Sequence, residues 1–365
     1  MKSLFLFSMV CLMTIATQAQ MKNDAYEFSF ESATRFIDLA KAATEGHMPT
    51  DADWNELFAT EGYRAAFSGR DDSLEWKQSI KDAFMLVFDK NKTTIVDSII
   101  ALPMEKRGEQ FYFIYNFKNL KEHVGEMHSF MHHTDFSKME RHGNALAKRH
   151  LPKAYKDIQP NYQKYYFVAW DPESRAWDGI FLDIYSFYSE GRSGMPRLLG
   201  HEMHHHYFAA LLEKKYTKDT QDPALIAIYR MQNEGTADLI NKKEMPTSKL
   251  GGYDKEAVKI YNADYLSSPS VLAELDSLTC GYLDGSLSMT QYRKAQYCAH
   301  MDGHTTGDYM TFLIRKHFGL KAAINCLGDF PAFVRLYNEA ARKSGTYMFT
   351  DRFVKHIEEE TEKMK

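Results

Sequence analysis

The sequence predicts an α+β fold that is predominantly helical and contains one small twisted sheet. Over most of its 365 residues, apolar side chains recur at the spacing of amphipathic helices. Aromatic and β-branched residues are instead concentrated in residues 162–170 and 179–188, as expected of strands. Two helices, predicted at about 196–216 and 224–242, carry polar motifs and are expected to pack antiparallel.

Residues 1–19 have the features of a secretory signal. Lys2 gives a basic start, an apolar run extends from residue 4 to residue 15, and Thr17–Ala19 resembles a small-residue cleavage site. The apolar run is too short to span a membrane, no later run is long enough, and no small residue precedes Cys11 as a lipid-attachment site requires. We therefore expect a secreted or periplasmic protein without a membrane span.

The rest of the chain is long enough for two lobes. The whole sequence has a formal net charge of −4, which gives no electrostatic footprint for nucleic-acid binding, and its aromatic content of 14% suits a large core. Cys280, Cys298 and Cys326 remain after the signal, which allows one disulfide and one free thiol. Their spacing does not match a zinc ribbon, so we expect buried or structural thiols.

Residues 20–150 are predicted to form an N-terminal helical region. Helical spacing covers residues 25–43 and 73–90, and Thr50–Asp53 is typical of a helix start. Six histidines between residues 123 and 150 could form a second metal site, but no pair has a carboxylate partner at suitable spacing. We expect these histidines to be scattered over solvent-facing helix surfaces.

Residues 151–245 are predicted to hold the sheet and the two central helices. The turn Asp171–Ser174 separates the two aromatic segments and predicts a hairpin. Asp222 and Pro223 form a typical helix start, an N-cap followed by proline at the first helical position.

Residues 246–365 are predicted to be helical again. The predicted breaks in this last region are Gly251–Gly252, Ser267–Pro269 and Gly281.

The first central helix contains the motif H-E-x-x-H at residues 201–205. Residues four apart lie on one face of a helix, so His201 and His205 would direct two imidazoles at one point, as a zinc ion requires. Glu202 would lie beside the metal, where a carboxylate can take a proton from water. Because His204 and His206 enrich the run in histidine, a loose cation-binding tract is the alternative.

The second central helix supplies the residues that argue against this alternative. From His205 to the end of the first helix, and from Pro223 to Glu234, the chain advances about 11 residues, or about 16 Å. An antiparallel return therefore brings Glu234 level with the two histidines as a third metal ligand. Asp238 lies four residues further on the same face, placed to accept the other ring N–H of a ligating histidine.

H-E-x-x-H followed by E-x-x-x-D on a second helix resembles the gluzincin branch of zinc metallopeptidases, the thermolysin-like arrangement. The likeness covers roughly residues 136 to 341 and extends to bacterial families described only as zinc-dependent peptidases. It implies a zincin-like catalytic domain that binds Zn²⁺ through His201, His205 and Glu234. It also implies that Glu202 is the general base and that Asp238 supports the ligands. The connection between the motifs is longer than in thermolysin, which leaves the connecting turn open.

The same resemblance assigns two further elements. Residues 179–184 resemble the strand that edges the cleft and pairs with substrate, although an ordinary core strand is the alternative. Residues 246–365 resemble a C-terminal lobe that closes the cleft. In this lobe His304 and Tyr309 are candidate donors to the oxyanion of the reaction. A helix-capping or buried histidine is the alternative for His304.

We therefore expect an exported zinc metallopeptidase that acts on a peptide or protein substrate and has no nucleic-acid partner. Two alternatives agree with the same residues: a zinc-binding or interaction protein with an inactive zincin fold, and a zinc amidase acting on a non-peptide amide. Structural zinc sites usually have four protein ligands. No fourth ligand is evident unless His204 turns toward the metal, which weighs against the first alternative.

Overall fold

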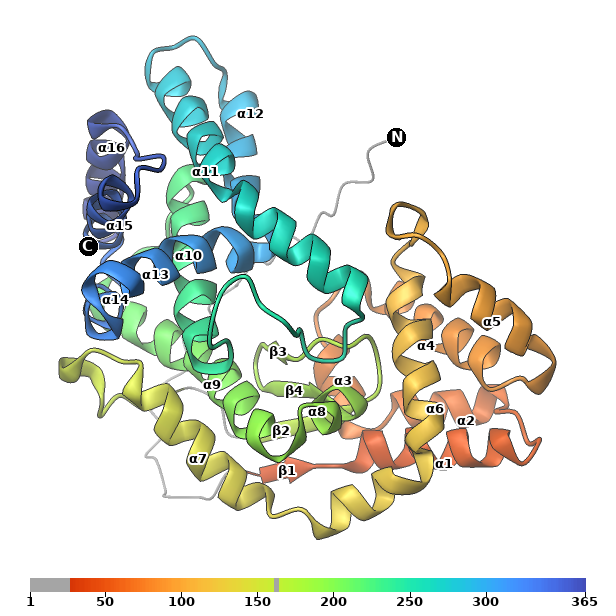
Figure 1. Cartoon of the computed structure of the whole chain (residues 1–365). Coiled ribbons are helices and arrows are strands. Elements are labelled where there is room, and N and C mark those ends of the chain that lie inside the picture. Colours follow the sequence, from red (N-terminus) through yellow and green to blue (C-terminus); the bar gives the residue numbers. More distant parts are fainter. Residues whose placement is uncertain (1–26, 161–163) are drawn as a thin grey trace.

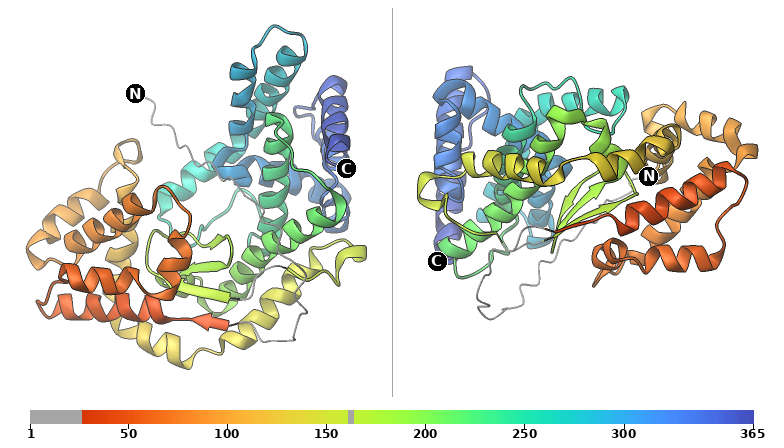
Figure 2. Two further views of the ribbon diagram at one scale, coloured as in Figure 1. Left: turned by 180° about the vertical axis from the view of Figure 1, so that it is seen from behind. Right: turned by 90° about the horizontal axis from the view of Figure 1, so that it is seen from below.

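The computed structural model describes residues 27–160 and 164–365, so the signal predicted at residues 1–19 lies outside the described residues. Helices make up most of the described chain and four strands form one mixed sheet within it, which confirms the predominantly helical α+β class. Figures 1 and 2 show the first helices of the chain, coloured red and orange, on one side of this sheet and the last helices, coloured blue, on the other. No helix in the described ranges has the length and apolarity needed to cross a membrane.

The sheet has the strand order β1-β2-β4-β3. Strands β1 (Glu27–Ser29), β2 (Lys164–Val168) and β4 (Ile180–Asp183) are parallel, and β3 (Arg175–Ala176) pairs antiparallel with β4. Phe28 of β1 lies opposite Tyr165 of β2, so a strand from the start of the described chain completes the sheet of the central region.

The hairpin predicted between residues 162–170 and 179–188 is wrong within the described residues. Strands β2 and β4 are parallel neighbours, and the true hairpin joins β3 to β4. Residues beyond Asp183 form helix α8 (Ile184–Ser189), because the Asp183 carboxylate caps it by accepting the backbone N–H of Ser186 at 2.7 Å. This cap overrides the strand propensity of the aromatic residues that follow.

A group of helices precedes the sheet strands of the central region. The predicted start at Thr50 is confirmed, because its side chain accepts the backbone N–H of Asp53 and caps α2. The bounds of these helices are α1 (Glu31–Thr44), α2 (Asp51–Phe58), α3 (Glu61–Phe67), α4 (Ser73–Val87), α5 (Thr93–Ile100), α6 (Gln110–His133) and α7 (Phe136–Arg149). Short 3-10 helices are η1 (Lys90–Lys92), η2 (Met104–Lys106) and η3 (Lys153–Tyr155).

The C-terminal part is helical as predicted, but two predicted breaks are wrong. Helix α11 (Lys255–Leu283) continues through both Ser267–Pro269 and Gly281, because tertiary packing outweighs their low helix propensity. The thiols of Cys280, Cys298 and Cys326 are free, and the last two are buried. The remaining helices are α12 (Met289–Tyr292), η4 (Arg293–Cys298), η5 (His300–Gly303), α13 (His304–Phe318), α14 (Leu320–Asn325), α15 (Phe330–Ser344) and α16 (Asp351–Lys363).

One contiguous apolar core extends from α1 through the sheet to α16. Tyr165 of β2, Trp170 just after it, and Tyr337 of α15 are fully buried in this core. Burying a large apolar side chain stabilises the fold by about 1.5–3 kcal/mol. Met203 and Tyr207 also belong to the core, so one face of the helix that carries the H-E-x-x-H motif is fixed by packing.

The two central helices are α9 (Gly191–Lys215) and α10 (Pro223–Asn241), and they run antiparallel. The Asp222 side chain caps α10 by accepting the backbone N–H of Leu225, with Pro223 in the first turn, as predicted. Residue numbers rise along α9 as they fall along α10. The contacts that show this are Arg197 with Ile240, His201 with Asp238, and His205 with Asn233.

Candidate metal centre

Two histidines of α9 meet at one point. His201 and His205 are separated by one helical turn, and their Nε2 atoms are 3.1 Å apart. His201 is buried and His205 is partly exposed. Helix α9 is held in this position by α7 on one side and α10 on another.

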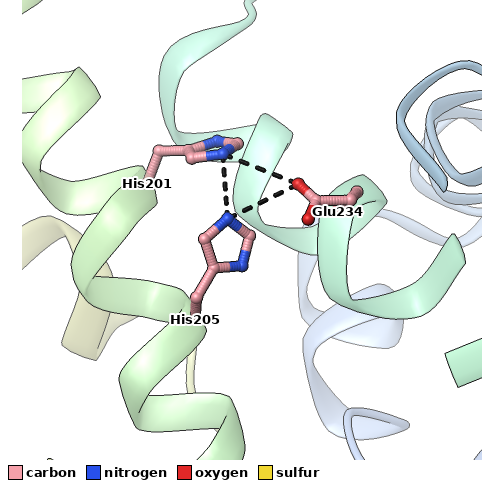
Figure 3. Close-up of side chains that lie close together, drawn as sticks. All are labelled: His201, His205 and Glu234. Carbon is pink, nitrogen blue, oxygen red and sulfur yellow. Dashed lines mark hydrogen bonds and ion pairs between the residues drawn. The ribbon is translucent and has the colours of Figure 1, made fainter. Parts of the chain in front are cut away.

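Glu234 of α10 completes a cluster of three side chains that commonly bind metals (Figure 3). Its Oε2 atom lies 3.7 Å from Nε2 of His201 and 3.4 Å from Nε2 of His205. The antiparallel packing of α9 and α10 brings the three residues together, although 29 positions separate Glu234 from His205 in the sequence.

The spacing of these three atoms fits a tetrahedral zinc site. Zinc–ligand bonds of about 2.0–2.1 Å separate neighbouring ligand atoms of a tetrahedron by about 3.4 Å. The three separations here are 3.1, 3.4 and 3.7 Å. In addition, Oε2 of Glu234 is buried without a hydrogen-bond partner among the described residues, and a cation is the partner that such an oxygen needs.

The outer nitrogens of the two imidazoles also face oxygen atoms. Nδ1 of His205 lies 3.0 Å from Oδ1 of Asn233, and Nδ1 of His201 lies 3.3 Å from Oδ1 of Asp238. Oxygen acceptors in these positions favour the tautomer with the proton on Nδ1, which leaves the lone pair of each Nε2 to face the cluster. Two lone pairs and a carboxylate that face one another are stabilised by a cation.

Glu202 lies beside this cluster, directly after His201 on α9, and is 4% exposed. Burial raises the pKa of its carboxyl group, while His201 and His205 act in the opposite direction. A carboxyl group whose pKa lies above its usual value is better suited to accept a proton and return it. Glu202 is not one of the three cluster residues, which leaves its carboxylate available for proton transfer.

His304, at the start of α13, lies against the same carboxylates. Its Nε2 is 3.4 Å from Oε2 of Glu234 and its Nδ1 is 2.8 Å from Oδ2 of Asp238. Burial disfavours its imidazolium, but the negative charges of Glu234 and Asp238 outweigh burial and raise the pKa of His304 to about 10. The structure therefore brings this candidate donor to the cluster.

Tyr309 and His204 are not brought to the cluster. The Tyr309 hydroxyl is 2.8 Å from Oγ1 of Thr346, and its ring packs edge-on against Tyr265. His204 is fully buried and its ring stacks on Phe208. The contacts therefore direct the candidate donor Tyr309 elsewhere and give no support to His204 as a fourth ligand.

A buried charge network behind Asp238 was missed by the sequence analysis. Nζ of Lys242 lies 2.5 Å from Oδ2 of Asp238 and 3.2 Å from Oδ2 of Asp308. The Tyr261 hydroxyl donates to the same oxygen of Asp308 at 2.8 Å. Despite burial, which acts in the opposite direction, the positive charges of Lys242 and His304 hold the pKa of Asp238 well below its usual value.

The signal that could have revealed this network is four-residue spacing. Lys242 follows Asp238 by four residues, and Asp308 follows His304 by four, so each pair shares one helix face. Asn233 directly precedes Glu234, but its role beside His205 depends on how α9 and α10 pack and is not visible in the sequence.

Glycines allow α10 and α13 to approach until their backbones touch. A Cβ atom on Gly235 would overlap the carbonyl group of Gly307, and a Cβ atom on Gly307 would overlap the carbonyl group of Met231. This close contact brings His304 within reach of Glu234 and Asp238, and it requires glycine on both helices.

The histidines of residues 123–150 form no metal-type cluster in the part of the chain that the structure describes. His132, His133 and His142 are exposed, as predicted. The prediction is wrong for His150, which is buried and has its Nδ1 2.8 Å from the carbonyl oxygen of Leu146. This backbone contact satisfies the buried ring without a metal.

Asp222, His356 and Glu360 form a second group close enough to hold a cation. Oδ2 of Asp222 already accepts from the Tyr292 hydroxyl at 2.7 Å and contacts Nε2 of His356 at 3.0 Å. Its Oδ1 atom caps α10. Hydrogen bonds therefore satisfy this group, which joins α16 to the start of α10.

Fold and site together define a predominantly helical α+β protein with a candidate zinc centre of two histidines and one glutamate. A family model described as "Putative zinc dependent peptidase (DUF5700)" matches residues 54–346. Because this match covers more than half of the chain, the protein belongs to that family. Comparisons with curated proteins and with solved structures gave no match.

Proposed function

We propose that this protein is a zinc-dependent peptidase of the gluzincin type. The observation that carries the proposal is the convergence of His201, His205 and Glu234 at tetrahedral spacing. Membership of a family described by zinc-dependent peptidase activity supports the class. The H-E-x-x-H motif on α9 and E-x-x-x-D on α10 support the gluzincin arrangement. Export is part of the proposal and rests on residues 1–19 alone.

In the proposed site, His201, His205 and Glu234 hold the zinc ion. When bound, zinc supplies a Lewis acid that polarises the scissile carbonyl and makes water acidic enough to lose a proton near neutral pH. Asn233 and Asp238 keep the two imidazoles oriented, so the rings need not reorganise. A set of three protein ligands is typical of catalytic zinc, whereas structural zinc usually has four.

Two further residues move or donate protons. Glu202 takes a proton from the attacking water and transfers it to the amine that leaves when the peptide C–N bond breaks. His304 is held by Asp238 through Nδ1, which leaves its Nε2–H on the side of Glu234. This N–H can donate to the carbonyl oxygen as negative charge develops on it, which lowers the energy of the transition state.

Hydrolysis of an unbiased peptide library by the zinc-loaded full chain tests this function. We expect cleavage that a chelator abolishes and added zinc restores. Glu202→Gln should retain zinc, because Glu202 is not a ligand in the proposed site. It should lower kcat/KM by at least about 100-fold, since general acid–base catalysis contributes roughly 10²–10⁴-fold.

Metal content, measured by mass spectrometry on each protein, separates loss of zinc from loss of catalysis. Glu213→Gln is a matched control, because Glu213 is an exposed carboxylate on the same helix. It should cleave the library as the wild type does. Full activity of Glu202→Gln, or no hydrolysis by the zinc-loaded wild type, would rule the proposal out.

A further inference from the structure

Charged side chains of α10 and of residues 302–308 face each other in pairs along the site. The row consists of residues 230, 234 and 238 of α10, which share one face of the helix, and of residue 242 directly after its end. The pairs are Arg230–Asp302 at 3.8 Å, Glu234–His304 at 3.4 Å, Asp238–His304 at 2.8 Å and Lys242–Asp308 at 3.2 Å.

The two ends of this row differ in their access to solvent. At one end, the side chains of Lys242 and Asp308 are 9% and 0% exposed. At the other end, those of Arg230 and Asp302 are 22% and 74% exposed. The row therefore opens to solvent at Arg230, one helical turn from the candidate metal ligand Glu234.

The guanidinium of Arg230 has no hydrogen bond among the described residues. Its contact with Asp302 is 3.8 Å long, beyond the range of a hydrogen bond. A guanidinium carries five N–H donors in a planar fork that matches a carboxylate. The fully buried side-chain nitrogens that lack a hydrogen-bond partner do not include those of Arg230. Because the Arg230 nitrogens have no hydrogen bond either, they are exposed, and their N–H donors are accessible to a ligand.

The segment opposite Arg230 is a strained turn. Met301 and Asp302 have φ values of +48° and +56°, the left-handed region that side chains with a Cβ rarely adopt. A Cβ atom on Gly303 would overlap the backbone carbonyl group of Arg230, so the turn rests directly on α10. Such strain persists where the surroundings impose it, which is common at ligand-binding sites.

We propose that Arg230 binds a carboxylate group of the substrate, with Asp302 as the competing carboxylate in the free protein. This inference rests on the proposed peptidase function and names its substrate class. One helical turn is about 5.4 Å, and an extended peptide advances about 3.3 Å per residue. The carboxylate therefore lies within about two residues of the scissile bond, at the C-terminus of the peptide or on an acidic side chain.

Two matched pairs of acetylated peptides test the inference on the zinc-loaded full chain. One pair has a C-terminal acid or amide, and the other has Glu or Gln next to the scissile bond. We expect the wild type to favour at least one carboxylate member by about 10- to 100-fold in kcat/KM, as expected for hydrogen bonds to a charged group. The pair that responds identifies the source of the carboxylate.

Variants connect this preference to Arg230. Arg230→Met should abolish the preference with unchanged zinc content, and Arg230→Lys should retain part of it, because the charge remains but the fork is lost. Asp302→Asn should increase the preference by removing the competing charge, and asparagine tolerates the left-handed backbone. Arg352→Met is the matched control: Arg352 of α16 forms an exposed ion pair with Asp284 and should leave the preference unchanged.

The outcomes separate this inference from the proposed function. If the wild type cleaves peptides without a carboxylate preference, or if Arg230→Met keeps the preference, the inference is overturned and the peptidase proposal stands. If the zinc-loaded wild type cleaves nothing, the proposed function fails, and calorimetric binding of the same peptides decides the role of Arg230. Selective binding of the acid members that Arg230→Met loses would then support the carboxylate site, whereas equal or absent binding would overturn it.

Discussion

The carboxylate of Asp238 serves two imidazoles at once. Its Oδ1 lies 3.3 Å from His201 and its Oδ2 lies 2.8 Å from His304, so one side chain orients a candidate metal ligand and a candidate oxyanion donor. The sequence predicted a contact from Asp238 to a ligating histidine, because both lie on helices that were expected to pack together. It could not predict the contact with His304, which depends on a third helix 66 residues away along the chain.

Lys242→Met tests how much the charge behind Asp238 contributes to stability. Removing the ammonium leaves Asp308 without its cation and leaves Asp238 with His304 as its remaining cationic partner. Breaking a buried ion pair in this way should reduce the free energy of unfolding by about 3–5 kcal/mol. Urea unfolding of the purified protein measures this change.

The double variant Lys242→Met/Asp308→Asn provides the control for this prediction. It also replaces the Asp308 carboxyl group, left without its ammonium partner, by a neutral amide, so it should recover part of the stability lost in the single variant. If Lys242→Met unfolds at the same urea concentration as the wild type, the network does not stabilise the fold as described.

Between helices, the site depends on two close approaches, α9 against α10 and α10 against α13. The sequence predicted the first, because the chain lengths from each motif to the connecting turn match and Asp222 marks the start of the second helix. The second was not predicted, because the sequence does not indicate that Gly235 and Gly307 lie opposite each other. Their close contact is visible only in the folded structure. The strand pairing was mispredicted for a similar reason, since a parallel pair leaves no turn signal between its own two strands.

Gly235→Ala should force α10 and α13 apart. The added Cβ would overlap the carbonyl group of Gly307, and overpacking of this kind costs about 1–3 kcal/mol of unfolding free energy. Gly125→Ala on α6 is the matched control, because its Cβ would meet nothing and alanine is favoured over glycine within a helix by about 0.5–1 kcal/mol. Thermal unfolding of both variants distinguishes them, and equal shifts would show that the helix contact tolerates a methyl group.

Across the whole chain, the apolar core joins regions that the sequence analysis treated separately. Strand β1 pairs with β2, and α16 reaches the start of α10 through Tyr292, His356 and Asp222. Patterns within single segments predicted helices that the structure contains, among them α4, α9 and α10. These long-range connections could not be predicted, because they join residues as far apart as the 137 positions between Glu27 and Lys164, with no local signature.

The contact between α16 and α10 predicts a dependence of stability on acidic pH. Burial tends to raise the pKa of Asp222, but hydrogen bonds from His356, Leu225 and Tyr292 outweigh it and lower the pKa below 3.8. A carboxyl group with a lowered pKa in the folded state stabilises the protein above its unfolded pKa. That contribution is lost as the pH falls through the folded value.

Urea unfolding below about pH 4 measures this loss. The free energy of unfolding should fall more steeply with decreasing pH for the wild type than for Asp222→Asn, in which asparagine can still cap α10. Parallel curves for the two proteins would show that Asp222 does not titrate with folding.

X-ray absorption at the zinc K-edge of the zinc-loaded full chain examines the metal centre itself. We expect one zinc ion per chain with two imidazole nitrogens and a carboxylate oxygen at about 2.0–2.2 Å. Glu234→Ala should lose the carboxylate oxygen. His356→Ala should leave the spectrum unchanged, because His356 lies with Asp222 and Glu360 in the second group of possible metal ligands and not in the proposed zinc site. Sulfur ligands, or a spectrum that both His205→Ala and Glu234→Ala leave unaltered, would contradict a zinc site formed by α9 and α10.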